Sequence, residues 1–122
     1  EDLQIRIKDF SNSDIPLSRT VLLGFSQGGA MALSVGTQLP LAGIIGCSAY
    51  PHPDWLPSVN SPPIILSHGN QDEIVPVTAS HKIVNLLEKA HVQVDLNLFE
   101  GGHEINDQMI GKFQIYLDQL FS

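Results

Sequence analysis

The sequence predicts an α/β fold in which helices flank a mostly parallel sheet. Short apolar runs alternate with segments of helical periodicity through most of the 122 residues, and this alternation favours right-handed crossovers. Most of the apolar runs also lack the polar alternation of a half-exposed strand, which is typical of strands buried on both faces of a parallel sheet. A single domain over residues 1–122 is therefore expected.

The first elements come before position 40. Apolar residues recur at helical spacing over 1–10, so this stretch is expected to be a helix or the end of one. Turn-forming residues over 11–19 predict a loop. The β-branched run TVLLGF, residues 20–25, predicts a buried strand, and a helix is expected over 28–39 because Pro40 then stops it.

Strands and helices continue to alternate in the rest of the chain. AGIIGCS, residues 42–48, predicts a second strand, and the five prolines of 50–63 predict an irregular excursion. IILSHG, 64–69, predicts a third strand, and the alternating run over 92–99 predicts a fourth. Helices are expected over 77–91, with Ile83, Leu86, Leu87 and Ala90 inward, and over 105–121, with Ile110, Phe113, Leu117 and Leu120 or Phe121 inward.

The charge of the chain argues against several classes of function. Six Lys and Arg residues stand against thirteen Asp and Glu residues, which gives a formal net charge of -7. Nucleic acids and anionic membranes bind clustered cations, so neither is an expected partner. No apolar run approaches the length of a transmembrane segment. Cys47 is the only cysteine, which excludes an intrachain disulfide and fits a reducing compartment, so a cytoplasmic location is expected.

A Gly-x-Ser-x-Gly motif stands between the first predicted strand and the helix that follows it. In this context Gly24 and Gly28 are expected to clear space for a strained turn that exposes the Ser26 hydroxyl. The turn would aim the Gln27 N–H at a reacting carbonyl, next to the positive end of the helix, as part of an oxyanion hole. The alternative is a glycine-rich turn that binds a phosphate or only packs.

Two later loops carry the partners that a nucleophilic serine needs. Asp72 follows the third predicted strand and His103 follows the fourth, so both are expected beside Ser26 at the carboxyl ends of parallel strands. His103 would accept the serine proton, and Asp72 would hold the imidazole tautomer. Taken singly, Asp72 is also a common turn residue, and His103 is also a common solvated loop residue. The order Ser, Asp, His is the one expected of an α/β hydrolase.

These blocks resemble one known family. GFSQGGAMAL, SHGNQDEIVPV and GGHEI are similar to the phospholipase/carboxylesterase family of serine hydrolases, which includes the acyl-protein thioesterases. The resemblance implies an α/β-hydrolase fold with Ser26 as nucleophile, Asp72 as acid, His103 as base and Gln27 as an oxyanion donor. It also implies that the substrates are carboxylic esters or thioesters. These substrates would be small molecules, lipids (for example lysophospholipids) or acylated proteins. No metal and no organic cofactor is expected.

The sequence departs from the family in what precedes the nucleophile. Members normally carry earlier strands and a loop beginning with His-Gly that donates the second oxyanion N–H. Here Ser26 stands near the start, and the only His-Gly pair, His68-Gly69, belongs to the third predicted strand. The expectation is therefore a C-terminal half that is weak or inactive alone. Its exposed sheet edge would favour pairing with a partner or with a second copy as a homodimer, and a non-catalytic binding half-domain is the alternative.

The stretch CSAYPHPDWLP contains the candidates for substrate specificity. Tyr50, Trp55 and Leu56 are candidates to line an acyl pocket or its rim, and ordinary loop packing is the alternative. The remaining histidines show no metal-ligand spacing, so no metal site is expected. Among them, His68 is expected to act through its backbone at a strand end.

Overall fold

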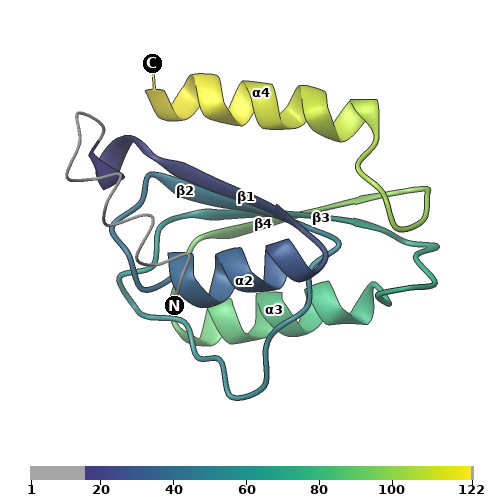
Figure 1. The fold of residues 1–122 in the computed structure, drawn as a ribbon, viewed down its shortest axis with the longest axis horizontal. Helices are drawn as coiled ribbons and strands as arrows, with labels where there is room; N and C mark the ends of the chain where they lie inside the picture. The colour runs from purple at the N-terminus through teal and green to yellow at the C-terminus, as the bar shows by residue number, and fades with distance from the viewer. Residues whose placement is uncertain (1–15, 122) are drawn as a thin grey trace.

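The structure, a computed structural model, describes residues 16–121 and contains one four-stranded parallel sheet. The strands lie in the order β1-β2-β3-β4, so each crossover leads to the neighbouring strand (Figure 1). The strands are β1 (Val21–Phe25), β2 (Gly43–Cys47), β3 (Ile64–Gly69) and β4 (Val94–Phe99). The helices are η1 (Leu17–Arg19), α2 (Gln27–Gly36), α3 (Thr78–Lys89) and α4 (Asp107–Phe121). The helix expected over 1–10 lies outside the described residues.

All four predicted strands are confirmed, and three predicted helices are confirmed with shorter limits. The α2 helix ends at Gly36 rather than at 39, because the chain tightens there into turns in which Gln38 N–H donates to Val35 and Leu39 N–H donates to Gly36. The α4 helix begins at Asp107, where the Asn106 side chain accepts the Met109 N–H at 2.9 Å.

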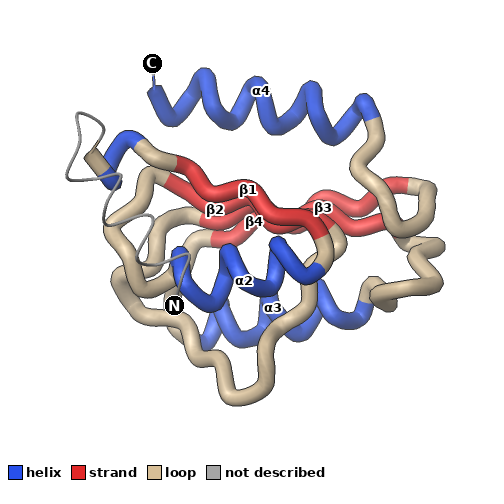
Figure 2. The backbone as a smooth tube through the Cα atoms, viewed as in Figure 1, coloured by secondary structure: helices blue, strands red, loops and turns tan. Residues whose placement is uncertain are grey.

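The helices cover both faces of the sheet. The α2 and α3 helices lie on one face, and α4 lies on the other (Figures 1 and 2). One hydrophobic cluster fills the space under α2 and α3, around Leu33, Ile44, Leu66, Ile83 and Leu87. A second cluster lies on the α4 side and includes Ile45, Ile65, Phe99, Met109 and Phe113. Two cores around one parallel sheet are the architecture that the sequence predicts.

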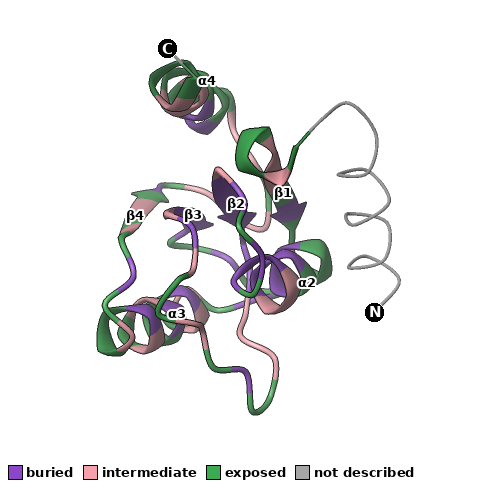
Figure 3. Cartoon of the chain, turned by 90° about the vertical axis from the view of Figure 1, so that its left-hand side faces the viewer, coloured by how far each residue is buried: buried purple, intermediate pink, exposed green. Residues whose placement is uncertain are grey.

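Burial differs sharply between the inner and outer strands of the described sheet. Every residue of β2 and β3 is buried, whereas β1 and β4 carry intermediate and exposed positions (Figure 3). On β1, the Leu23 side chain is 54% exposed and Phe25 is 37% exposed. The β1 strand is therefore an edge with an apolar surface in the described part of the chain.

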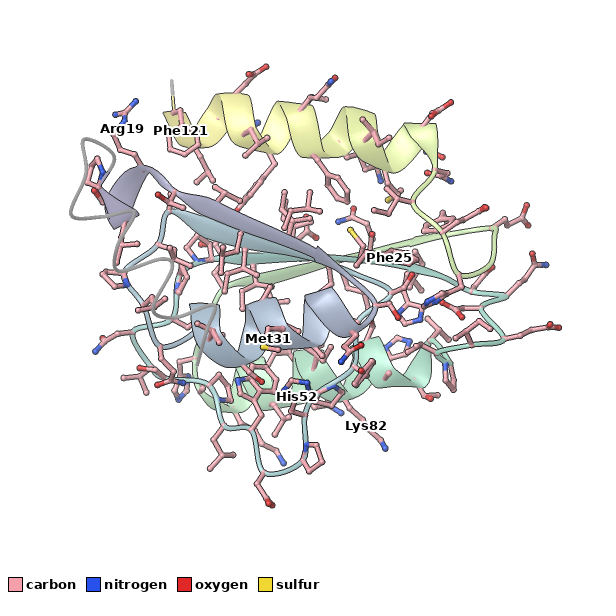
Figure 4. All side chains as sticks on the ribbon, in the orientation of Figure 1. Arg19, Phe25, Met31, His52, Lys82 and Phe121 are labelled. Atoms are coloured by element: carbon pink, nitrogen blue, oxygen red, sulfur yellow. The ribbon has the colours of Figure 1, made fainter. Side chains whose placement is uncertain are left out.

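The buried face of the α4 helix agrees with the prediction at Phe113 and departs from it at Ile110. Met109 and Phe113 are its buried residues, whereas Ile110 is 44% exposed and Phe121 is 39% exposed. The prediction that Ile110 points inward is therefore wrong. Of the two alternatives predicted near the end of the helix, Leu120 rather than Phe121 faces the sheet, since its Cδ1 would lie 3.2 Å from a Cβ on Gly43. The apolar surface of the helix is wider than the part that the sheet covers, so periodicity alone does not select the buried stripe. Near the end of the helix, the Arg19 guanidinium lies 5.7 Å from the centre of the Phe121 ring (Figure 4).

Strand register brings the functional loops together. Phe25 of β1 is level with Cys47 of β2, which is level with Ser67 of β3 and in turn with Asn97 of β4. Because all four strands run in the same direction, the segments that follow them leave from the same edge of the sheet. The loops carrying the predicted site residues meet at this edge.

Candidate active site

The turn between β1 and α2 holds Ser26 in a strained conformation. Its φ is 58° and its ψ is -117°, a combination that residues with a side chain rarely adopt. Gly24 is required for this turn, since a Cβ at that position would overlap the Gly28 carbonyl group. The Ser26 N–H donates to the Cys47 carbonyl at 2.8 Å, which ties the turn to the end of β2.

The steric reason expected for Gly28 is wrong. Apart from its chain neighbours and the backbone of its own helix, a Cβ placed on Gly28 would meet no atom of the described residues within 4 Å. Gly29 is the constrained position, because its Cβ would lie 2.8 Å from the Cβ of Ala49. The contact on Gly24 comes from the backbone of position 28, so that residue takes part in the turn through its main chain.

The Ser26 hydroxyl lies within hydrogen-bond distance of the histidine that the sequence assigns to it. Ser26 Oγ is 3.0 Å from His103 Nε2, and His103 Nδ1 is 2.8 Å from Asp72 Oδ2. The carboxylate can only accept from Nδ1, so in the neutral ring that nitrogen carries the proton. The unprotonated Nε2 then accepts from the Ser26 hydroxyl. The structure brings together the three predicted residues, with the histidine oriented to take the serine proton.

Asp72 is held by backbone amides on its other side. Its Oδ1 accepts the Ile74 N–H at 2.9 Å and the Val75 N–H at 2.8 Å. Burial acts to raise the pKa of Asp72, but hydrogen bonds from His103 and from these two amides outweigh it and lower the pKa below its ordinary value. The carboxylate is therefore ionised at neutral pH.

Backbone contacts fasten the loop of Asp72 to the loop of His103. The Asn70 N–H donates to the Phe99 carbonyl and the Gln71 N–H donates to the Gly101 carbonyl, both at 2.9 Å. These bonds continue the pairing of β3 with β4 past the ends of the strands. Asp72 and His103 are therefore positioned by the same pair of strands.

An aromatic ring lies beside the His103 imidazole. The Phe25 and His103 ring centres are 4.7 Å apart and the ring planes are tilted by 51° (Phe25 is labelled in Figure 4). Tilted contacts at this distance are favourable for aromatic pairs. The Phe25 ring therefore supports the imidazole from the side of the nucleophile turn.

The predicted oxyanion donor also stands where the turn requires it. Gln27 is the first residue of α2, and Ser26 precedes it as N-cap without using its side chain to cap the helix. The positive end of the helix dipole thus lies at Ser26. The role of the Gln27 N–H remains a prediction.

The three candidate pocket residues differ in their burial and contacts. Trp55 is only 8% exposed, and its Nε1 donates to Thr37 Oγ1 at 3.1 Å, at the end of α2 opposite to Ser26. Its placement in an acyl pocket is therefore wrong, and the loop-packing alternative holds. Leu56, the next residue along the chain, is 72% exposed. Tyr50 follows the end of β2, and its role at the rim remains a prediction.

The sequence predicts a backbone role for His68, but its side chain is what the structure uses. The imidazole is fully buried, and both of its nitrogens make contacts within hydrogen-bond distance near Asp72. A histidine in an apolar strand run requires polar partners when it is buried, and this is the signal that the sequence offers. No group of three His, Cys, Asp or Glu side chains within residues 16–121 has the arrangement of metal ligands.

Comparison with known proteins gives the family of this fold and site. The model of the phospholipase/carboxylesterase family matches residues 3–121. The chain belongs to this family. An acyl-protein thioesterase 1 of Yarrowia lipolytica is 37% identical over 81 residues, which cover 60% of this chain and 36% of that protein. The acyl-protein thioesterase 1 of Neurospora crassa is 34% identical over 106 residues, covering 75% of this chain and 42% of the relative.

Several solved structures have the same fold as this chain. The crystal structure of esterase PE8 superimposes with a TM-score of 0.88 at 29% identity, over 97% of this chain and 58% of that one. SOBER1 of Arabidopsis thaliana gives a TM-score of 0.87 at 21% identity, over 99% of this chain and 62% of the other. The fold is that of the α/β hydrolases, of which the chain covers a part. It spans less than half the length of the two curated relatives above.

Proposed function

We propose that the whole protein is a serine hydrolase that cleaves carboxylic esters or thioesters. The observation that carries the proposal is the continuous path from Ser26 Oγ to His103 at 3.0 Å and from His103 to Asp72 at 2.8 Å. Membership of the phospholipase/carboxylesterase family, together with relatives named acyl-protein thioesterase, supports esters and thioesters as the bonds that are cleaved.

The proposed first half-reaction forms an acyl-enzyme. Ser26 Oγ attacks the substrate carbonyl carbon while its proton passes to His103 Nε2. Asp72, which keeps its negative charge, stabilises the resulting imidazolium. The carbonyl oxygen becomes an oxyanion and accepts the Gln27 N–H. When the tetrahedral intermediate collapses, the imidazolium returns the proton to the leaving alcohol or thiol.

The second half-reaction repeats these steps with water. His103 takes a proton from a water molecule, which attacks the acyl-enzyme and releases the carboxylic acid. The Ser26 oxygen leaves and regains its proton from the imidazolium. Every proton comes from water or from one of these side chains, so the cycle balances without a further reactant.

We propose that the second oxyanion donor comes from outside residues 16–121. Loss of one donor reduces rate by about 10²–10³-fold in hydrolases of this mechanism, or about 2.7–4 kcal/mol. The 122-residue chain alone is then expected to turn over slowly.

Small-molecule or lipid esters and acylated proteins are the proposed substrates, and the cytoplasm is the proposed location. Within residues 16–121, no helix has the length and apolar character that crossing a membrane requires.

A fluorophosphonate probe tests the proposed nucleophile in the whole protein. Wild-type protein should be labelled on Ser26 and should hydrolyse p-nitrophenyl acyl esters and acyl thioesters. Ser26→Ala should lose both labelling and turnover, while Ser34→Ala, a serine within α2, should keep them. Labelling that survives in Ser26→Ala would contradict the proposal.

The exposed apolar edge of β1 supports a second candidate function. Leu23 and Phe25 present apolar surface there, and an unpaired strand edge can bind another chain. The alternative is a non-catalytic half-domain that binds a partner, or a second copy as a homodimer, through this edge. Size-exclusion chromatography with light scattering of the 122-residue chain, wild-type and Leu23→Lys, tests it. A folded, unlabelled chain whose dimer is lost in Leu23→Lys supports this alternative.

A further inference from the structure

A second histidine lies beside the acid of the candidate triad. His68 is the penultimate residue of β3, and its side chain has an exposed fraction of 0%. The proton transfers proposed above make no use of it. A buried imidazole requires a hydrogen-bond partner for each nitrogen, so the partners that it has are informative.

The contacts of His68 define its tautomer. Nε2 lies 2.7 Å from the Val75 carbonyl oxygen and 3.5 Å from Asp72 Oδ2, and both of these groups are acceptors. Nε2 therefore carries a proton. Nδ1 lies 2.6 Å from Ser80 Oγ, so in the neutral ring it accepts a hydrogen bond from the Ser80 hydroxyl. Neither nitrogen is left without a partner.

These contacts close a ring around the Asp72 carboxylate. Val75 donates its N–H to Asp72 Oδ1 at 2.8 Å and accepts from His68 through its carbonyl. Asp72, Val75 and His68 thus fix one another, and Ser80 anchors the group to α3. The same Oδ2 that receives His103 Nδ1 at 2.8 Å also lies 3.5 Å from His68 Nε2, whose hydrogen bond goes to the Val75 carbonyl. His68 can therefore set where that oxygen stands.

We propose that His68 is a positioning residue for Asp72 and, through Asp72, for the His103 imidazole. This proposal rests on the function proposed above. A displacement of about 1 Å in a catalytic geometry can reduce the rate by about 10²-fold. His68 acts by holding the Asp72–Val75 turn between β3 and α3 through its hydrogen bonds to Val75 and Ser80, with its Nε2 close to the carboxylate. It neither touches the substrate carbonyl nor exchanges a proton in the reaction.

Variants at position 68 separate positioning from bulk packing in the whole protein. His68→Leu fills much of the space without a donor, whereas the Gln amide in His68→Gln can still donate to the Val75 carbonyl. His81→Leu is the matched control, because His81 is exposed on α3. For His68→Leu, kcat should fall by about 10–100-fold with little change in KM. His68→Gln should recover most of kcat, and His81→Leu should match the wild type.

An NMR readout tests the proposal without relying on turnover. The His103 Nδ1 proton, hydrogen-bonded to Asp72, should resonate far downfield in the wild type, in His68→Gln and in His81→Leu. In His68→Leu it should move upfield or broaden by exchange with water. An unchanged resonance and unchanged kcat in a folded His68→Leu variant would overturn the proposal. A loss of kcat in His68→Gln as large as the loss in His68→Leu would also overturn it.

Two further measurements keep the test decisive. If His68→Leu does not fold, Ser80→Ala takes its place, because it removes the hydroxyl that donates to His68 Nδ1. In Ser80→Ala, an upfield shift of the His103 Nδ1 proton and a loss of kcat, both smaller than those expected for His68→Leu, support the proposal. No change in either quantity overturns it. Fluorophosphonate labelling of the wild type is measured in parallel. If Ser26 is not labelled, the proposed hydrolase function fails, and the His103 resonance still decides whether His68 positions Asp72.

Discussion

Gly69 and Gly101 pack backbone against backbone where β3 and β4 end. A Cβ at position 69 would overlap the carbonyl groups of Gly101 and Gly102. This contact lets the loop of Asp72 approach the loop of His103 closely enough for the 2.8 Å hydrogen bond between them. The hydrogen bond between Asp72 and His103 therefore depends on Gly69, which has no side chain.

Gly69→Ala should separate these loops. The added methyl group meets backbone, which cannot rotate away, so we expect the free energy of unfolding to fall by about 1–3 kcal/mol. Esterase activity should fall further than stability alone explains, because the Asp72–His103 bond is stretched. Gly111→Ala is the control, since a Cβ there meets no described atom within 4 Å. Equal activity in the two purified variants would contradict this prediction.

The two glycines of the nucleophile turn should differ in their tolerance of alanine. Gly24→Ala should abolish labelling of Ser26, because its Cβ would overlap the backbone at position 28. Gly28→Ala should remain active and gain up to about 1 kcal/mol of helix stability. Thermal unfolding and probe labelling of both variants provide the check. Loss of labelling in a folded Gly28→Ala protein would contradict this prediction and would indicate that the turn needs glycine at position 28, as the motif alone predicts.

Asp72→Asn should reduce turnover far more than Asp54→Asn. Asparagine at position 72 cannot stabilise the imidazolium and can favour the wrong histidine tautomer, an effect of about 10⁴-fold on kcat in serine hydrolases of this type. Asp54 lies in the loop after β2 with a φ of 63°, a conformation that asparagine also adopts readily. Its variant should have wild-type kcat. Equal losses in the two variants, measured as kcat on one ester, would refute the assignment of Asp72.

The lowered pKa of Asp72 predicts a pH dependence of folding. The pKa is below the ordinary value of 3.8, so at pH values between the native and unfolded pKa the unfolded state binds more protons. The contribution of Asp72 to stability is complete above the unfolded pKa and is lost as the pH falls through the native one. Urea unfolding from pH 6 down to pH 3 should show this loss in the wild type. In Asp72→Asn the slope should be shallower, and an identical slope would count against the prediction.

Local sequence patterns predict the elements and the loops of the candidate site well. The β3 run, IILSHG, is bounded by prolines and a glycine, so its limits coincide with the observed strand. Ser26, Asp72 and His103 are predictable because each follows a strand of one parallel sheet, whose geometry forces those loops together. The family resemblance agrees with these positions.

Features that depend on packing between distant segments are not predictable in this way. An aromatic residue such as Trp55 suits a pocket, yet Thr37 offers it a hydrogen bond 18 positions away. The exposure of Ile110 depends on how much of α4 the sheet covers. The role of His68 depends on Ser80, and no local pattern links a strand residue to a later helix in that way.

The hydrogen bond between Ser26 and His103 joins residues 77 positions apart, across three crossovers of a parallel sheet. Contacts of such long range form late and slowly in folding, because the closure of each loop reduces chain entropy before the contact stabilises the fold. During synthesis the nucleophile leaves the ribosome well before its base. The emerging polypeptide therefore carries an unactivated serine until β4 pairs with β3 and brings His103 to it. Under the proposed function, competence to hydrolyse is a late event in the maturation of this domain, and a partly folded chain has no activated nucleophile to release into the cell.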